Sequence, residues 1–240
     1  MLTSRMKETL ERIVPGAADQ RHIAGDDTLQ LHLARYQFAA QFARGKVLDI
    51  ACGVGYGSAV LAEVAKVGHV TGVDLSEEAL DVARQRYARP NITFVQGDCM
   101  TYRGDPVETI VSLETVEHLP EPEKFIRRIA EQLLSQGTLI ASVPVTPSMD
   151  FNPYHLHDFT PRRFEALMRS AGLQVVDRFL QVQSYRPVAA LRRKEARMAD
   201  ARRNLSGYYV RHPGKLMLRL CSVVRDGFAN KYLTLACRKV

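Results

Sequence analysis

The chain reads Val47-Leu48-Asp49-Ile50-Ala51-Cys52-Gly53-Val54-Gly55-Tyr56-Gly57-Ser58 at the point that decides its fold. A short apolar run with an aspartate leads into a turn with glycine at alternate positions, and residues 58–65 continue as an apolar helix pattern. Glycine lets the backbone pass close to a ligand because no Cβ stands in the way. We predict a strand, a tight loop and a helix N-terminus, where open α/β sheets bind nucleotide-like ligands. A plain connecting turn is the alternative for this motif taken alone.

Three later apolar runs also end at a carboxylate. The runs that begin at residues 69, 92 and 109 lead to Asp74, Asp98 and Glu114. Asp74 follows the glycine loop by about twenty residues, the distance at which such folds place an acid on the ribose hydroxyls. Polar residues at the carboxyl ends of four successive strands would line one crevice.

The glycine spacing differs from that of nicotinamide-dependent dehydrogenases, which is G-x-G-x-x-G. Here the glycines are Gly53, Gly55 and Gly57, and Asp49 lies just upstream. An acid at that point is poorly placed for a pyrophosphate and suits a ligand with a positive charge or with amine and hydroxyl donors. S-adenosylmethionine has an α-amino group, a sulfonium and a ribose, and no phosphate.

Four motifs in order carry a family resemblance. They are Val-Leu-Asp-Ile-Ala-Cys-Gly-Val-Gly-Tyr-Gly, Val-Thr-Gly-Val-Asp-Leu-Ser, Gln-Gly-Asp-Cys and Ser-Leu-Glu-Thr-Val-Glu-His-Leu. The chain resembles the class I S-adenosylmethionine-dependent methyltransferases, and among them the small-molecule, sugar and ubiquinone-pathway O-methyltransferase groups. The resemblance covers about residues 30–180 and the last strand.

The resemblance implies a set of residues that bind S-adenosyl-L-methionine: Arg35, Asp49, Gly53, Gly55, Asp74, Leu75, Asp98, Cys99 and Leu113. Asp49 and the glycines would cradle the methionine end, and Asp74 would hold the ribose. Leu75 would pack on the adenine, and Asp98 would accept from its amino group. Leu113 would contact the cofactor near the sulfur, and Arg35 would reach its carboxylate. The alternative for Arg35 is a solvated helix residue.

The composition fits an ordinary single α/β domain with additions. The chain has 240 residues and a formal net charge of +7. No stretch is long and apolar enough to cross a bilayer, and the start lacks the apolar core of a signal peptide. The four cysteines are far apart and show no C-x-x-C spacing. They predict reduced thiols in a cytoplasmic protein without a metal site or a disulfide framework.

Strand and helix patterns alternate from residue 46 to 145, which predicts a parallel sheet. We expect an α/β, Rossmann-like, seven-stranded, mostly parallel sheet with helices on both faces. The resemblance implies that the last strand is antiparallel and lies between the fifth and sixth. The expected divisions are a helical cap or lid (1–45), the cofactor-binding core (46–184), a basic helical insertion (185–230) and the final core strand (231–240).

Individual elements follow from local patterns. Helices are predicted at residues 3–13, 28–42, 120–134 and 160–170, and later strands at 139–144, 173–182 and 231–238. Ser76 and Thr160 are expected as helix N-caps.

The insertion supplies most of the net charge. Its first half carries Arg192, Arg193, Lys194, Arg197, Arg202 and Arg203. It could be a solvated extension or a homodimer face, a lid for an acidic, phosphorylated or lipid-linked acceptor, or a peripheral contact with an anionic membrane. Nucleic acid is not expected, because no aromatic platform is interleaved with the arginines.

Methyl transfer to a hydroxyl needs an aligned acceptor and help with its proton, a role that suits histidine. His155 and His157 lie in the loop after the fifth strand, and His118 follows the fourth. We predict these three as acid/base candidates. Similar methyltransferases often carry a His-x-His-x-Phe loop over the acceptor. Tyr154, His22 and Glu114 are predicted to bind the acceptor.

Each histidine also has a structural interpretation. His155 and His157 could bind a metal or only shape their loop, and His118 could cap a helix or bond to Glu114. No further metal ligands cluster in the sequence, so no metal is expected.

The sequence thus predicts a methyltransferase for a small molecule, acting on oxygen with histidine assistance. N-methylation of an amine-bearing small molecule or sugar is the main alternative. A non-catalytic binding subunit and a nicotinamide-dependent oxidoreductase rank lower.

Overall fold

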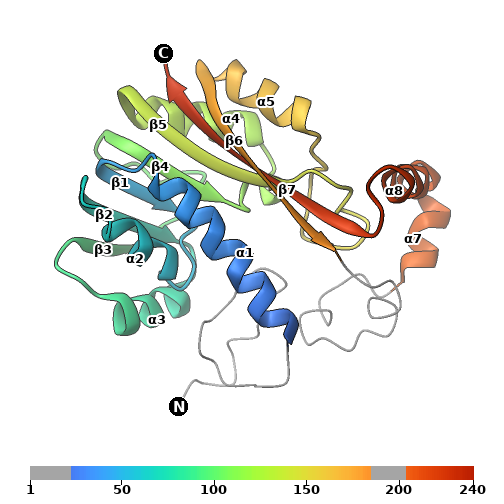
Figure 1. The fold of residues 1–240 in the computed structure, drawn as a ribbon, viewed down its shortest axis with the longest axis horizontal. Coiled ribbons are helices and arrows are strands. Elements are labelled where there is room, and N and C mark those ends of the chain that lie inside the picture. Colours follow the sequence, from blue (N-terminus) through green and yellow to red (C-terminus); the bar gives the residue numbers. More distant parts are fainter. Residues whose placement is uncertain (1–22, 185–203) are drawn as a thin grey trace.

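The computed structural model describes residues 23–184 and 204–240, which contain one seven-stranded sheet (Figure 1). The strands are β1 (Gly45–Ile50), β2 (Val67–Asp74), β3 (Ile92–Gln96), β4 (Val107–Leu113), β5 (Leu133–Pro144), β6 (Leu173–Ser184) and β7 (Ala229–Lys239). The helices are α1 (Ile23–Ala40), α2 (Tyr56–Ala62), α3 (Glu77–Tyr87), η1 (Val116–His118), α4 (Pro122–Gln132), α5 (Pro161–Ser170), α7 (Leu205–Arg211) and α8 (Pro213–Asp226).

The strand order is β3-β2-β1-β4-β5-β7-β6. Strands β1 to β5 pair in parallel, and β7 pairs antiparallel with both β5 and β6. The predicted fold class and the place of the last strand are confirmed. The carboxyl ends of the parallel strands therefore share one edge, where the order reverses between β1 and β4.

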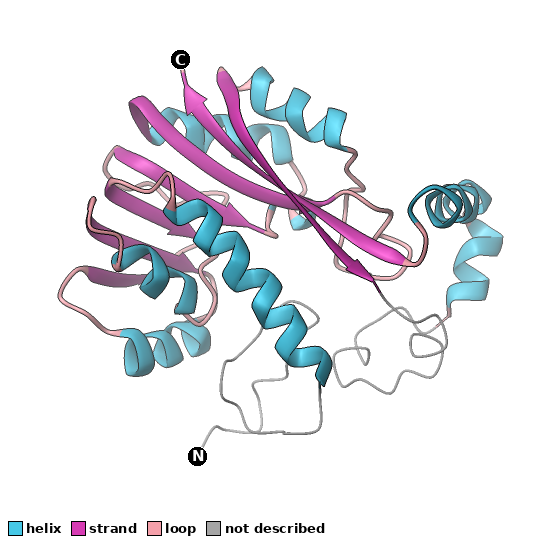
Figure 2. Ribbon diagram, viewed as in Figure 1, coloured by secondary structure: helices cyan, strands magenta, loops and turns pink. Residues whose placement is uncertain are grey.

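Alternate residues of the central strands face opposite sides of the sheet. Val47 belongs to one buried cluster, with residues of α1, α2 and α3, and Leu48 belongs to the other, with residues of α4 and α5. Ile110 and Val111 of β4 divide in the same way. Helices thus cover both faces of the sheet (Figure 2), and the near-continuous apolar strands are explained by burial on both sides.

Two helices begin at the capping residues that the sequence predicts. The Ser76 hydroxyl accepts a hydrogen bond from the Ala79 amide, and the Thr160 hydroxyl accepts one from the Arg163 amide. Both predicted N-caps are confirmed. They satisfy amides that have no partner within the helix.

The main difference from the predicted elements lies between α4 and β5. The helix ends at Gln132, and β5 begins at once at Leu133, before the predicted start at residue 139. The pairing with β4 shifts register there, and Gln136 has a φ of 60°. Because the pairing is irregular here, the first residues of β5 have the local sequence pattern of a turn and are hard to recognise as a strand from sequence.

The N-terminal and insertion predictions are only partly covered by the described residues. Helix α1 begins at Ile23, five residues before the predicted start. The predicted helix 3–13, His22 and the arginine-rich residues 192–203 lie outside the described ranges. None of the helices in the described ranges is long and apolar enough to cross a membrane.

Gly57 in α2 gives a test of this packing. A Cβ built at Gly57 would lie 1.9 Å from Cζ of Tyr36, whose ring is buried. We expect Gly57→Ala to lower the free energy of unfolding by about 1–3 kcal/mol, because the ring must shift. Chemical denaturation measures this.

The matched control is Gly214→Ala in α8, where a Cβ would meet nothing within 4 Å. That change should alter stability by less than about 0.5 kcal/mol. Equal effects of the two substitutions would contradict the close approach of Tyr36 to Gly57.

Candidate functional site

A buried carboxylate lies at the base of the glycine loop. Asp49 is fully buried in β1. Its Oδ2 accepts a hydrogen bond from the Ser58 hydroxyl at 2.6 Å, and its Oδ1 accepts one from the Tyr36 hydroxyl at 3.2 Å. Burial raises the pKa of Asp49 to about 7, although both hydrogen bonds lower it. Because the pKa of this carboxyl lies close to neutral pH, a cationic group that binds beside it would favour its ionised form.

The glycine loop is held open by backbone conformation. Gly53 and Gly55 have φ angles of 56° and 84°, and Ala51 has a φ of 60°. Such positive φ values favour glycine, and several of them in one loop indicate a backbone conformation typical of functional sites. The Gly53 amide donates to Oδ2 of Asp74 at 2.8 Å, and the Ser76 amide donates to its Oδ1 at 2.9 Å. The end of β2 and the glycine loop are thereby tied together.

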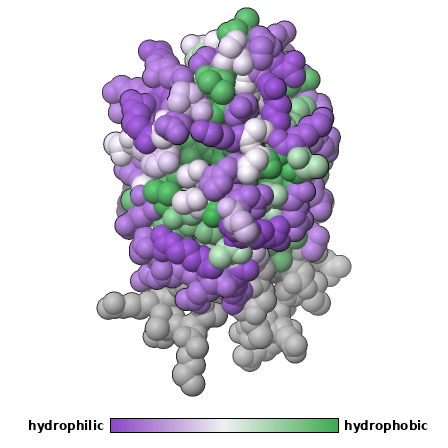
Figure 3. All heavy atoms as spheres, turned by 90° about the vertical axis from the view of Figure 1, so that its left-hand side faces the viewer, coloured by the Kyte–Doolittle hydropathy of each residue, from purple (hydrophilic) through white to green (hydrophobic). Residues whose placement is uncertain are grey.

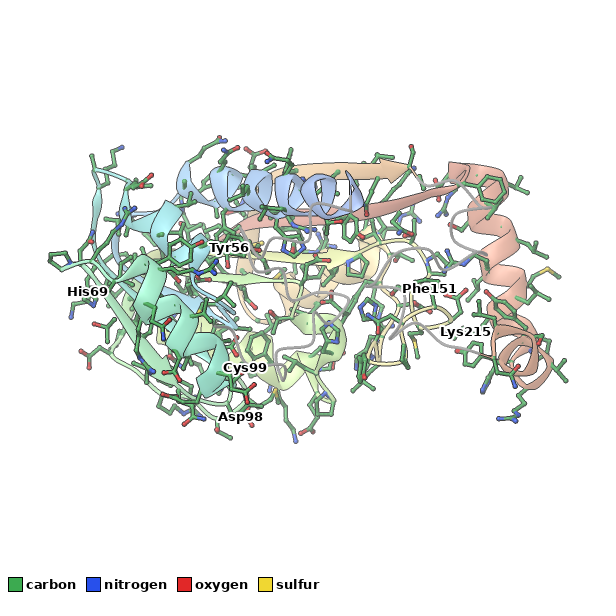
Figure 4. The ribbon with its side chains drawn as sticks, turned by 90° about the horizontal axis from the view of Figure 1, so that it is seen from below. Tyr56, His69, Asp98, Cys99, Phe151 and Lys215 are labelled. Atoms are coloured by element: carbon green, nitrogen blue, oxygen red, sulfur yellow. The ribbon has the colours of Figure 1, made fainter. Side chains whose placement is uncertain are left out.

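The adenine side of the predicted site is apolar and open. Leu75 is 69% exposed just past β2. Asp98 and Cys99 follow β3 and lie together in Figure 4. The Asp98 carboxylate accepts from the Met100 amide, and burial raises the pKa of Cys99 to about 11. Cys99 is therefore a neutral thiol at physiological pH.

Arg35 is buried, which overturns the alternative of a solvated helix residue. It is 1% exposed, lies over the Tyr232 ring at 4.8 Å, and its Nη1 is 3.3 Å from Oε1 of Glu114. Glu114 has a φ of 49° and also accepts from the Ser142 hydroxyl. Among the described residues, Nε of Arg35 has no hydrogen-bond partner, and Nη1 has the ionic contact with Glu114 but no hydrogen bond. A buried guanidinium with unused donors suits a ligand carboxylate.

These residues fit S-adenosylmethionine. Asp49 is suited to an ammonium group, Arg35 to a carboxylate, Asp74 to hydroxyls, and Leu75 to a flat ring. The elements carrying them meet at one sheet edge.

A second cluster forms where the fourth and fifth strands end. We call residues 147–160, between β5 and α5, the histidine loop. The rings of His118 and His155 pack edge to face with centroids 4.7 Å apart. With the fully buried Glu117, they offer ligand atoms that all lie within 4.8 Å of one another. This trio could hold a divalent metal ion, a set that the sequence analysis did not identify.

Hydrogen bonds orient all three predicted histidines. Nδ1 of His118 donates to the Tyr154 carbonyl at 3.1 Å, and Nε2 of His157 donates to the Leu119 carbonyl at 3.0 Å. Nδ1 of His155 lies 2.7 Å from the Ser148 hydroxyl. His155 and His157 therefore have separate partners, although they are only two residues apart. Tyr154 is 58% exposed, as a residue facing an acceptor could be.

Comparisons with known proteins agree with this geometry. Residues 48–141 match the family model described as a methyltransferase domain. A Mycolicibacterium smegmatis protein named "Probable S-adenosylmethionine-dependent methyltransferase" is 28% identical over 183 residues, covering 73% of this chain and 68% of that protein. The chain is a class I S-adenosylmethionine-dependent methyltransferase.

Other relatives of this methyltransferase differ in the atom they methylate. Phosphoethanolamine N-methyltransferase 1 of Arabidopsis thaliana is 31% identical, covering 57% of this chain and 31% of that protein. A ubiquinone biosynthesis O-methyltransferase of Neisseria meningitidis is 29% identical, with coverages of 56% and 66%. The methyltransferase thus spans between 31% and 68% of the length of these relatives.

A solved structure supports the fold of the methyltransferase. It is a putative methyltransferase from Bacillus halodurans with a TM-score of 0.68 and 18% identity, covering 87% of this chain and 99% of that chain. At this identity the likeness concerns the fold alone.

The C-terminal helices clamp the histidine loop of the methyltransferase. Arg219 of α8 makes a bidentate contact with the buried Asp150, and its guanidinium donates to the Pro147 carbonyl. Lys215 donates to Asp158 at 2.7 Å, and the Tyr209 hydroxyl donates to Asp150. Figure 4 shows Lys215 near the loop that contains Phe151.

Sequence reasoning missed several residues of these clusters: Tyr36, Ser58, Glu117, Ser142, Ser148, Asp150, Lys215 and Arg219. Only Glu117 carried a local signal, since it adjoins His118 between β4 and α4. The others come from elements that meet only after folding.

The raised pKa of Asp49 gives a prediction for the methyltransferase. In the folded protein the pKa of Asp49 is about 7, above its ordinary 3.8. The folded state therefore holds this proton more tightly than the unfolded state does, and the resulting contribution to stability is fully present below about pH 4. That contribution is lost as pH rises through about 7. We expect Asp49→Asn to unfold at a higher temperature than the wild type at pH 8, with the gap closing toward pH 4.

The same variant should bind S-adenosylmethionine about ten- to a hundredfold more weakly, because a neutral amide cannot form an ion pair with an ammonium group. Calorimetry measures the affinity and thermal melts the stability. Asp105→Asn is the control, since its carboxylate is 86% exposed, and it should change neither. Unchanged affinity in Asp49→Asn would contradict the assignment.

Proposed function

We propose that this methyltransferase modifies a hydroxyl oxygen of a small acceptor, with His155 as the base. The observation that carries the proposal is the connected series His155, Ser148 and Asp158. The Ser148 hydroxyl lies 2.7 Å from His155 Nδ1 and 3.4 Å from Oδ1 of Asp158. A catalytic base is commonly held in place by a further hydrogen-bonded group, and here the Ser148 hydroxyl, backed by Asp158, has that position.

The protonation pattern follows from Asp158. Burial raises its pKa, but hydrogen bonds from Lys215 and from the Ser148 and Met149 amides hold it below the ordinary value overall. Asp158 is therefore ionised at neutral pH and accepts from the Ser148 hydroxyl. Ser148 then accepts from Nδ1–H of His155, which leaves the lone pair of the neutral ring on Nε2.

His118, in η1 after β4, supports the same role. A carbonyl can only accept, so the contact with Tyr154 keeps the proton of neutral His118 on Nδ1 and the lone pair on Nε2. The adjacent Glu117 would stabilise an imidazolium in either ring once a proton has been taken. His157 donates through Nε2 to Leu119 and serves in this scheme to fix the loop.

S-adenosylmethionine supplies an electrophilic methyl group when bound. We assign the cofactor contacts as predicted: Asp74 to the ribose, Leu75 and Asp98 to the adenine, Asp49 and Arg35 to the methionine end, and Leu113 beside the sulfur. We assign Tyr154 and Glu114 to the acceptor, which would lose its proton to Nε2 of His155.

An amine acceptor is the second candidate. The similarity to a phosphoethanolamine N-methyltransferase favours it. A neutral amine is already nucleophilic, so the enzyme would need only to align it. The two candidates differ in their need for a histidine base.

The acceptor's chemical class follows from the charge of the C-terminal region. Residues 185–230 carry eleven lysines and arginines against three acids, so the segment stays basic after Lys215 and Arg219 are paired with Asp158 and Asp150 of the histidine loop. An acidic, phosphorylated or lipid-linked acceptor suits this environment. The domain divisions and the cytoplasmic location remain predictions.

The test is His155→Ala, assayed with S-adenosylmethionine and a panel of small hydroxylated and amine-bearing acceptors. For a hydroxyl acceptor we expect kcat to fall at least about a hundredfold, because a general base is lost. Cofactor affinity should stay unchanged. Mass spectrometry of the product identifies the methylated atom.

His69→Ala is the matched control, since His69 lies near the amino end of β2, where its Nε2 is 3.0 Å from the Thr93 hydroxyl. It should retain full turnover. Wild-type kcat in His155→Ala would overturn the base assignment, and a product methylated on nitrogen would favour the second candidate.

A further inference from the structure

Helix α8 is amphipathic, but its polar side faces the protein and its apolar side faces solvent. Its polar stripe consists of Lys215, Arg219, Ser222 and Asp226, spaced four, three and four residues apart. Ser222 is buried, and Arg219 is bonded to Asp150 beneath the helix. The polar stripe therefore faces the protein.

The opposite side of α8 is apolar and exposed. We call Met217, Leu220 and Val224 the outer stripe. They are 64%, 52% and 88% exposed, and Leu216 beside them is 38% exposed. At 100° per residue these side chains lie roughly opposite the polar stripe. A monomer seldom leaves such a contiguous apolar stripe in water without a partner.

The charge of the segment that contains α8 indicates what kind of partner would cover the outer stripe. Arg225 flanks it with a side chain that is 71% exposed, and Arg211 at the end of α7 is also exposed. Along the sequence, the segment 185–230 that contains α8 is basic, with eleven lysines and arginines against Glu195, Asp200 and Asp226, and of these Lys215 and Arg219 are paired on the inner side of the helix. An apolar strip with basic flanks matches an anionic lipid surface. A second copy would bring two basic regions together, which opposes a dimer through this face.

We propose that α8 docks the protein on an anionic lipid bilayer through the outer stripe. The helix would lie in the interface, with the apolar side chains entering the lipid and the arginines at the headgroups. Figure 1 places α7 and α8 at the end of the molecule opposite α3 and β3. The face at that other end is largely hydrophilic, with scattered apolar patches (Figure 3).

Docking would bring the histidine loop close to the bilayer. The inner side of α8 holds that loop through Lys215 to Asp158 and Arg219 to Asp150. One helix therefore joins the proposed lipid contact to the proposed acceptor side. The docking itself does not depend on which atom is methylated.

The experiment is flotation of the full chain with vesicles of phosphatidylcholine alone and of phosphatidylcholine mixed with phosphatidylglycerol. We expect binding to the mixed vesicles only, weakening as salt increases. The double variant Met217→Glu, Val224→Glu should lose at least about tenfold in partition coefficient, because apolar insertion is replaced by charge repulsion.

The matched control is Leu134→Glu together with Val176→Glu, two side chains that are each 41% exposed on β5 and β6. It should bind vesicles like the wild type. Thermal melts and S-adenosylmethionine affinity check that every variant is folded, and the affinity is also a separate measure of the methyltransferase site.

Three outcomes would overturn docking. One is that the wild type fails to bind the mixed vesicles. Another is that the Met217→Glu, Val224→Glu variant, folded, binds them as well as the wild type does. The third is a concentration-dependent dimer in sedimentation that this variant abolishes, which would assign the stripe to a second copy.

Discussion

The site depends on one buried carboxylate. Asp49 joins α1 to α2 through the Tyr36 and Ser58 hydroxyls, directly below the glycine loop. Tyr36 can approach only because residue 57 lacks a side chain. The protein keeps this group fully buried, which raises its pKa to about 7. A buried acid is costly to ionise, so Asp49 lowers the stability of the ligand-free protein above neutral pH. The same carboxylate is available to a cationic ligand. The protein thus gives up some stability for binding.

A second constraint is the parallel pairing of β4 and β5. It sets Leu113, the last residue of β4, opposite Ser142. The chain then turns at Glu114, where φ is positive. The turn directs the Glu114 carboxylate to Arg35 and Ser142. It also starts η1, whose Glu117 carbonyl accepts from the Leu156 and His157 amides of the histidine loop. The proposed cofactor side and the proposed acceptor side are therefore built from the same two strand ends.

Much of this could be predicted from the sequence, because the signals are local. The strand–loop–helix unit at 47–58 and the acids after each strand gave the fold and the cofactor motifs, and Ser76 and Thr160 gave helix starts. What failed depended on pairing or burial. The early start of β5 lies where its register with β4 shifts, and that pairing is not visible in the sequence. For Arg35 the sequence could not decide between a cofactor contact and a solvated helix residue, because nothing in its own helix shows that Tyr232 covers it. The Glu117, His118 and His155 cluster joins two loops that are 37 residues apart along the sequence, as counted from His118 to His155.

The orientation of α8 shows the limit of sequence reading most clearly. Periodicity identifies an apolar stripe and a polar stripe, and the usual rule turns the apolar one toward the core. Here the rule is reversed, because the histidine loop presents Asp150 and Asp158, and a buried acid is costly unless it is paired. Arg219 and Lys215 supply that pairing, and the apolar stripe is left outside. The electrostatic requirement of the loop beside the proposed base thus determines which surface the protein offers to its surroundings.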